Sequence, residues 1–135
     1  MNLKTIFDNV AEFQNATEQP VNSFPTLSNS QTEDFLRFNL MKEENREYIV
    51  ASANKDLVEI LDSLVDQLYV LAGTINQHGL QDVIEEAFNR VHANNLTKVG
   101  VDGKVIRDAD GKILKPEGFV PVDLSDLVNL KFDKL

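Results

Sequence analysis

Apolar residues recur every three or four positions through about the first hundred residues, which is the spacing of amphipathic α-helices. Thr32 and Asp82 are the predicted N-caps of the second and fourth helices, and His78-Gly79 is the predicted end of the third. The later helices are long and their connections are short, which favours antiparallel packing in a bundle. The four predicted helices cover residues 3–16, about 32–52, about 56–77 and 82 to about 94.

The pattern changes after Lys98. Asp102-Gly103-Lys104-Val105-Ile106 recurs eight residues later as Asp110-Gly111-Lys112-Ile113-Leu114, and two β-branched runs joined by Asp-Gly turns predict a small β-hairpin. Residues 123–130 favour a last short helix or turn. The predicted fold is therefore all-α, an antiparallel bundle of four to five helices with a small C-terminal β-hairpin. We expect one domain over residues 1–135, with a helical core over about 1–98 and the hairpin and tail over about 99–135.

Composition narrows the class of protein. Hydrophobic residues make up 42% of the chain, which predicts a folded globular protein. The net charge of −9 argues against binding a nucleic-acid polymer, which requires basic patches. The chain has no cysteine, which excludes disulfides and zinc–thiolate sites. Since we find neither a secretory leader nor an apolar run near 18 residues, we expect a soluble cytoplasmic protein without a membrane partner.

Carboxylates are concentrated in two of the predicted helices. Glu43-Glu44-Asn45-Arg46-Glu47 is followed after eleven residues by Glu59-Ile60-Leu61-Asp62, and Asp66 lies one turn further on. If these helices pack antiparallel, Glu44 and Glu47 face Glu59 and Asp62. Such an oxygen-only site suits Mg²⁺ or Mn²⁺, and Mg²⁺ commonly bridges to substrate phosphates. The alternative from the residues alone is a solvated acidic face with no ligand.

These two motifs, Glu-Glu-x-x-Glu and Glu-x-x-Asp, resemble the signature of the MazG-like, all-α nucleoside triphosphate pyrophosphohydrolases. The surrounding sequence is similar to the phosphoribosyl-ATP pyrophosphohydrolase-like branch, which is common in bacteria and their phages. The resemblance extends from Phe7 to Leu127. The segments that carry it are Leu36-Arg37, the run from Asp62 through Tyr69-Val70-Leu71-Ala72-Gly73-Thr74, the run Phe88–Lys98, and the Asp-Gly-Lys repeats.

The resemblance implies an all-α fold, dependence on Mg²⁺, and cleavage of an NTP or dNTP between its α and β phosphates to give a monophosphate and pyrophosphate. By motif position, it implies that Glu43 and Glu44 are catalytic, with Glu43 orienting a water molecule or taking its proton. Asp66 would hold a second metal ion or a ribose hydroxyl. The implied metal ligands are Glu44, Glu47, Glu59, Asp62 and Asp66.

The resemblance also implies a set of phosphate-binding residues and a homodimer or homotetramer. Arg37 belongs to that set, although pairing with Glu33 or Glu44 on its own helix is the alternative for it. Two other functions stay open: a catalytically idle helical module that binds a nucleotide or a protein, and a hydrolase of a related diphosphate such as phosphoribosyl-ATP. The implied phosphate-binding residues are Arg37, Asn95, Lys98, Lys112 and Lys115.

Overall fold

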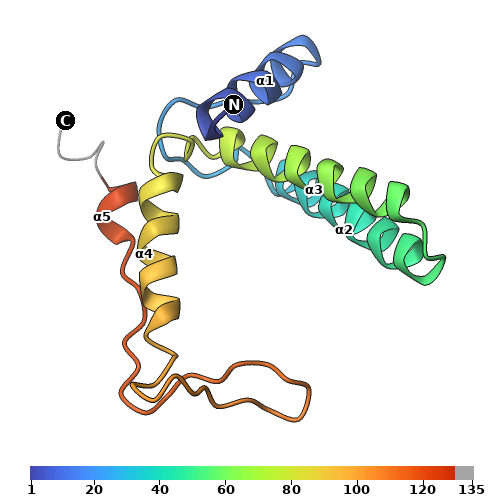
Figure 1. Cartoon of the computed structure of the whole chain (residues 1–135). Coiled ribbons are helices and arrows are strands. Elements are labelled where there is room, and N and C mark those ends of the chain that lie inside the picture. The colour runs from blue at the N-terminus through green and yellow to red at the C-terminus, as the bar shows by residue number, and fades with distance from the viewer. Residues whose placement is uncertain (130–135) are drawn as a thin grey trace. The chain divides into compact units, whose positions relative to one another are not determined.

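The protein is mostly helical, as the hydrophobic pattern predicts. The structure is a computed structural model, and it describes residues 1–129 (Figure 1). Within these residues it contains no β-sheet, so the all-α prediction is confirmed. The helices are α1 (Leu3–Ala16), α2 (Gln31–Ala53), α3 (Leu57–Gln77), α4 (Ile84–Leu96) and α5 (Ser125–Val128).

The chain divides into two compact units, Met1–Asp82 and Val83–Leu135, and each is described by itself. The first unit contains α1, α2 and α3, and the second contains α4 and α5. That the whole chain folds as a single domain stays a prediction. No helix within residues 1–129 is both long and apolar enough to cross a membrane.

Helices α2 and α3 form an antiparallel pair joined by a tight turn (Figure 1). Lys55 occupies this turn with a φ of 55°, a left-handed conformation that allows the chain to reverse within three residues. Asp56 then caps α3, because its carboxylate accepts a hydrogen bond of 3.1 Å from the backbone N–H of Glu59. The turn therefore sets α2 and α3 side by side, which is the arrangement that the acidic motifs require.

Two predicted helix starts are wrong. Ser30, not Thr32, caps α2, since its hydroxyl accepts a hydrogen bond from the N–H of Glu33 and the helix already begins at Gln31. Thr32 lies in the first turn of the helix, and its side chain caps no backbone N–H. Asp82 does not cap α4, which begins at Ile84 after Val83 and has no side-chain cap.

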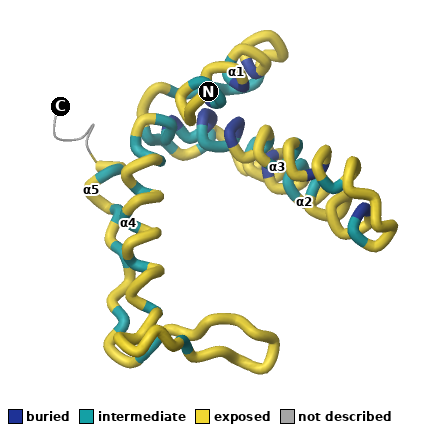
Figure 2. The backbone as a smooth tube through the Cα atoms, in the orientation of Figure 1, coloured by how far each residue is buried: buried dark blue, intermediate teal, exposed yellow. Residues whose placement is uncertain are grey.

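Several of the buried residues of α1, α2 and α3, which Figure 2 colours dark blue, have polar side chains that connect the three helices. Gln14 of α1 donates to Gly73 O of α3 at 2.9 Å and accepts from the amide of Asn76 at 3.0 Å. Arg37 of α2 donates to the Thr74 hydroxyl, to the Gln19 side chain and to Val70 O. Because buried polar groups are costly unless paired, this network specifies one arrangement of the three helices.

The predicted β-hairpin does not form. In the described part of the second unit, its two arms are joined by a single antiparallel bridge, between Arg107 and Ile113, with no strand on either side. Hydrogen bonds from Leu114 N to Ile106 O and from Asp108 N to Lys112 O flank this bridge. The prediction is wrong because each β-branched run is short and both arms are largely exposed, and an isolated two-stranded hairpin is marginal in water.

Candidate metal centre

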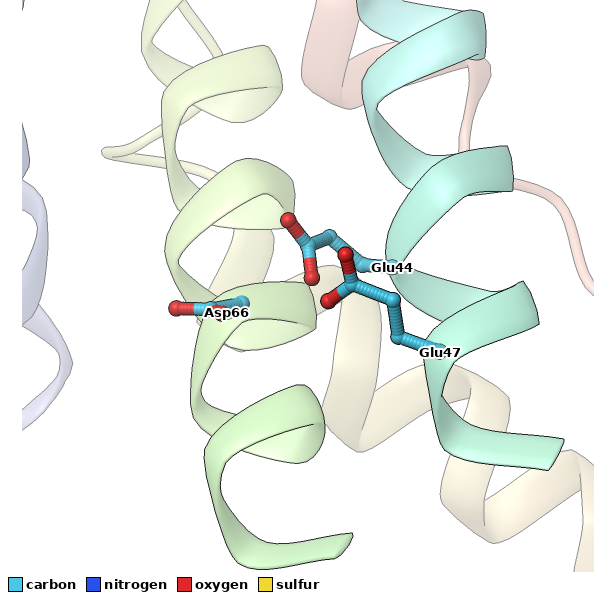
Figure 3. A group of neighbouring side chains, drawn as sticks. All are labelled: Glu44, Glu47 and Asp66. Atoms are coloured by element: carbon cyan, nitrogen blue, oxygen red, sulfur yellow. The ribbon is translucent and has the colours of Figure 1, made fainter. Parts of the chain in front are cut away.

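Three of the predicted carboxylates lie close together on α2 and α3: Glu44 and Glu47 extend from α2 towards α3, where Asp66 lies (Figure 3). Glu44 and Glu47 lie on α2 three residues apart, a spacing that places both on one helical face. Asp66 lies on α3, which runs alongside that face. One carboxylate oxygen from each residue lies within 4.8 Å of the others. The antiparallel pair therefore concentrates three negative charges at one point along the two helices.

One oxygen of the Glu44 carboxylate is shielded from solvent. Its Oε2 atom is buried and has no hydrogen-bond partner among the described residues. A buried carboxylate oxygen without a partner is costly, so the group needs either a proton or a cation beside it.

The pKa values of the cluster point in the same direction. Burial, together with the nearby Glu47, Asp66 and Glu43 carboxylates, raises the pKa of Glu44 from 4.5 to about 7. Burial also raises the pKa of Asp66, and the charges of Asp62 and Glu47 add to that effect. Without a cation, Glu44 therefore takes up a proton near neutral pH.

The residues fit a hard divalent cation. Three carboxylates supply only oxygen donors, which Mg²⁺, Mn²⁺ and Ca²⁺ prefer. The unpartnered Glu44 oxygen is free to act as a ligand atom, and a cation beside the cluster would offset the burial and the neighbouring charges that raise the pKa of Glu44.

Glu43, Glu59 and Asp62 are not members of this close group within residues 1–129. Asp62 is exposed on α3 one turn before Asp66, near enough for its charge to raise the pKa of Asp66. Glu43 is exposed beside Glu44 on α2. Glu59 lines a cavity that adjoins the group through Glu47. The ligand roles of Glu59 and Asp62 and the catalytic role of Glu43 stay predictions.

The cavity beside the cluster has a volume of about 370 Å³ and lies between the C-terminal part of α2 and the start of α3. Val50 and Ala51 provide apolar lining, and Arg46 and Asn54 provide polar groups that the sequence does not predict as part of the site. The signal for Arg46 was its position inside the Glu-Glu-x-x-Glu motif. Asn54 gave no signal, because only the turn after α2 brings it to the cavity.

The predicted phosphate-binding residues lie in both units. Arg37 is buried in the first unit, where three of its nitrogen atoms donate hydrogen bonds to protein oxygens. These bonds connect α2 to α3 and to the loop after α1. In the second unit, the ammonium groups of Lys98 and Lys115 each lie 5.7 Å from the centroid of the Phe119 ring. Asn95 and Lys112 are exposed at the end of α4 and in the bridged turn, respectively.

A model of the phosphoribosyl-ATP pyrophosphohydrolase family matches residues 10–95, which is more than half of the chain. The match includes every residue of the acidic cluster and of the adjoining cavity, together with Arg37 and Asn95. Lys98, Lys112 and Lys115 lie beyond it. No curated protein sequence matches the chain.

Proposed function

The chain belongs to the phosphoribosyl-ATP pyrophosphohydrolase family, and we propose that it is a Mg²⁺-dependent enzyme that hydrolyses an NTP or dNTP between the α and β phosphates. The family is one of metal-dependent nucleotide pyrophosphohydrolases. The observation that carries the proposal is the convergence of Glu44, Glu47 and Asp66, with an unpartnered buried oxygen on Glu44. These residues would hold the cation; Glu59 and Asp62 complete the proposed ligand set.

The proposed chemistry needs three actions from the protein. Bound Mg²⁺, or Mn²⁺ in its place, would neutralise phosphate charge and favour ionisation of the attacking water. Glu43 or Glu44 accepts the proton of that water, as a carboxylate within reach of the attacking water can do. The water oxygen forms a bond to the α phosphorus, the bond from that phosphorus to the oxygen bridging the β phosphate breaks, and pyrophosphate leaves from a nucleoside monophosphate.

Lys98 and Lys115 support phosphate binding by the second unit. Both ammonium groups lie at the same Phe119 ring, and neither makes an ion pair within residues 1–129. Two uncompensated positive charges beside one ring are available to an anion, and lysine serves as a mobile point charge on phosphate oxygens. We propose that they form a phosphate-binding set together with Asn95 and Lys112.

A homo-oligomer is the second part of the proposal. Large apolar side chains of α3 face solvent in the single chain: Leu57 is 76% exposed, Val58 75% and Leu61 63%. Contiguous apolar surface of this kind marks an interaction site, and a symmetric homo-oligomer is the common solution. Light scattering should find a dimer or tetramer that Leu61→Lys dissociates, whereas Leu27→Lys, in the exposed loop before α2, should not. A monomeric parent protein would refute this part.

The substrate is tested directly by product analysis. The purified protein is incubated with Mg²⁺ and each standard NTP and dNTP, dUTP or phosphoribosyl-ATP, and monophosphate, diphosphate, phosphate and pyrophosphate are resolved. Monophosphate and pyrophosphate, lost on addition of EDTA, are expected from a nucleoside triphosphate. The family match favours phosphoribosyl-ATP as the second candidate substrate, and its hydrolysis alone would move the assignment to that substrate.

Two variants and a control test the site. Glu47→Gln and Asp62→Asn should abolish turnover while the helical content is kept, because each removes a proposed ligand charge. Glu12→Gln removes an exposed carboxylate of α1 outside the cluster and should leave turnover unchanged. Full turnover in Glu47→Gln would exclude the cluster as the active site. Nucleotide binding without turnover of any substrate would instead support an idle binding module.

A further inference from the structure

Arg46 differs from the other arginines of the chain. Arg37, Arg90 and Arg107 each donate at least one hydrogen bond to a protein oxygen. The guanidinium of Arg46 makes no hydrogen bond or ion pair with any residue in the range 1–129, although carboxylates precede and follow it on α2. A free arginine fork inside the acidic motif is therefore available to a ligand.

The surroundings of Arg46 are concave. Arg46 lines the cavity of about 370 Å³ that shares Glu47 with the acidic cluster, and this volume is within the range of small-molecule sites. It is the single cation among the lining residues. Because Glu47 belongs to both the cavity and the cluster, an anion held in the cavity would lie close to a cation held by the cluster.

The lining chemistry indicates which part of a nucleotide fits here. None of the described side chains that line the cavity is aromatic, so the cavity lacks the surface on which a base would stack. Arg46 and the Asn54 amide supply N–H donors, and a guanidinium binds phosphate oxygens in pairs. The Asp56 carboxylate is already used as the cap of α3. Glu47, Asp56 and Glu59 also line the cavity, so a phosphate there would need the cation of the cluster to offset their charge. Arg46 and Asn54 therefore provide donors for a phosphate group but no stacking surface for a base.

We propose that Arg46, assisted by Asn54, binds the β and γ phosphates of the substrate in this cavity and holds them as the departing pyrophosphate. The proposal rests on the proposed hydrolysis but can be tested without it, since pyrophosphate with a divalent cation is a ligand in its own right. In this arrangement, Arg46 opposes the charge that builds up on the leaving group, which the carboxylates of the cluster cannot do.

The test is calorimetric titration of the full-length protein with pyrophosphate in the presence of Mg²⁺. Arg46→Gln should weaken binding about tenfold or more, the usual effect of losing a charge-assisted bond to phosphate, and Arg46→Lys should recover part of it. Lys4→Gln is the matched control, because it removes the same charge from an exposed position on α1, away from both cavities that Arg46 lines, and it should bind nearly as the parent does. Titration with Mn²⁺ alone should give similar affinities in all four proteins.

The outcomes separate this inference from the proposed function. If Arg46→Gln and Lys4→Gln bind pyrophosphate equally well, or if the parent protein does not bind it, the role of Arg46 is refuted. If Arg46→Gln weakens nucleotide binding but leaves pyrophosphate binding unchanged, the cavity holds another part of the nucleotide and the inference is overturned as well. If the parent hydrolyses no nucleotide but binds pyrophosphate through Arg46, the proposed hydrolysis fails and the binding site stands.

Discussion

Replacing Glu44 by glutamine should stabilise the metal-free protein, although Glu44 is a proposed catalytic residue. The substitution keeps the size of the side chain and removes one of three crowded negative charges. It also places an amide donor beside the Glu47 and Asp66 carboxylates. If the cluster exists to hold a cation, its charges are a cost to the fold when that cation is absent.

The magnitude follows from the pKa of Glu44, which rises from 4.5 to about 7 in the folded protein. Below pH 4.5 the group is protonated in the folded and unfolded states, and its charge costs nothing. Above about pH 7 it is ionised in both states, and the full cost is present. At 1.36 kcal/mol per pKa unit, the cost is about 3 kcal/mol, an upper bound because solvent screens part of it. The free energy of unfolding of the metal-free protein should therefore fall as pH rises between these values.

The assay is urea unfolding, followed by circular dichroism, in the presence of EDTA at pH 4 and pH 8. At pH 8, Glu44→Gln should raise the free energy of unfolding by about 1–3 kcal/mol, and at pH 4 the gain should vanish. Glu12→Gln, which removes an exposed charge outside the cluster, is the control and should show no such pH dependence. Added Mg²⁺ at pH 8 should stabilise the parent more than Glu44→Gln.

A different pattern would contradict this reasoning. If Glu44→Gln destabilises the metal-free protein at pH 8, the carboxylate makes a favourable contact and the cluster is a structural network. A gain of equal size at both pH values would show that side-chain packing, not charge, is responsible.

Further predictions concern the glycines that allow close packing in the first unit. Gly73→Ala should lower the free energy of unfolding by about 1–3 kcal/mol, because a Cβ there would lie 2.5 Å from Nη2 of Arg37 and displace it. Urea unfolding measures this loss, and an unchanged free energy of unfolding would refute the role of the contact. Gly79→Ala should cost more than Gly103→Ala, since both glycines have a positive φ but only at Gly79 would a Cβ clash, at 1.9 Å, with Phe24 O. Melting temperatures compare the two variants, and equal losses would show that backbone strain alone matters.

Much of the candidate site was predictable from local patterns. The apolar spacing of α1, α2 and α3 and the position of His78-Gly79 are local properties, and the helices lie where that spacing predicts them. The acidic motifs are local as well, because carboxylates three or four residues apart on a helix must share a face. The resemblance to the phosphoribosyl-ATP pyrophosphohydrolase-like branch is confirmed by the family match over residues 10–95.

Other features depend on residues that are distant in the sequence. The sequence predicts that Arg37 binds phosphate or pairs with a carboxylate of its own helix. Its guanidinium is instead hydrogen-bonded to Thr74 and Val70, thirty-seven and thirty-three residues further along the chain. The convergence of Asp66 with Glu44 and Glu47, and the opening of a cavity beside Arg46, require the register between α2 and α3.

The predicted β-hairpin is a case in which strong local signals do not lead to the expected structure. The local signals for its turns are strong, but strands persist only when cross-strand packing adds to the hydrogen bonds, and these arms are largely exposed. Periodicity and motif spacing thus determined the helices and the chemistry of their acidic face, since both follow from the geometry of a single helix. Tertiary packing decided which carboxylates meet, which arginine forms no hydrogen bond within residues 1–129, and that the Asp-Gly turns there do not nucleate a sheet. These outcomes depend on burial and desolvation by neighbouring residues that the local sequence does not identify.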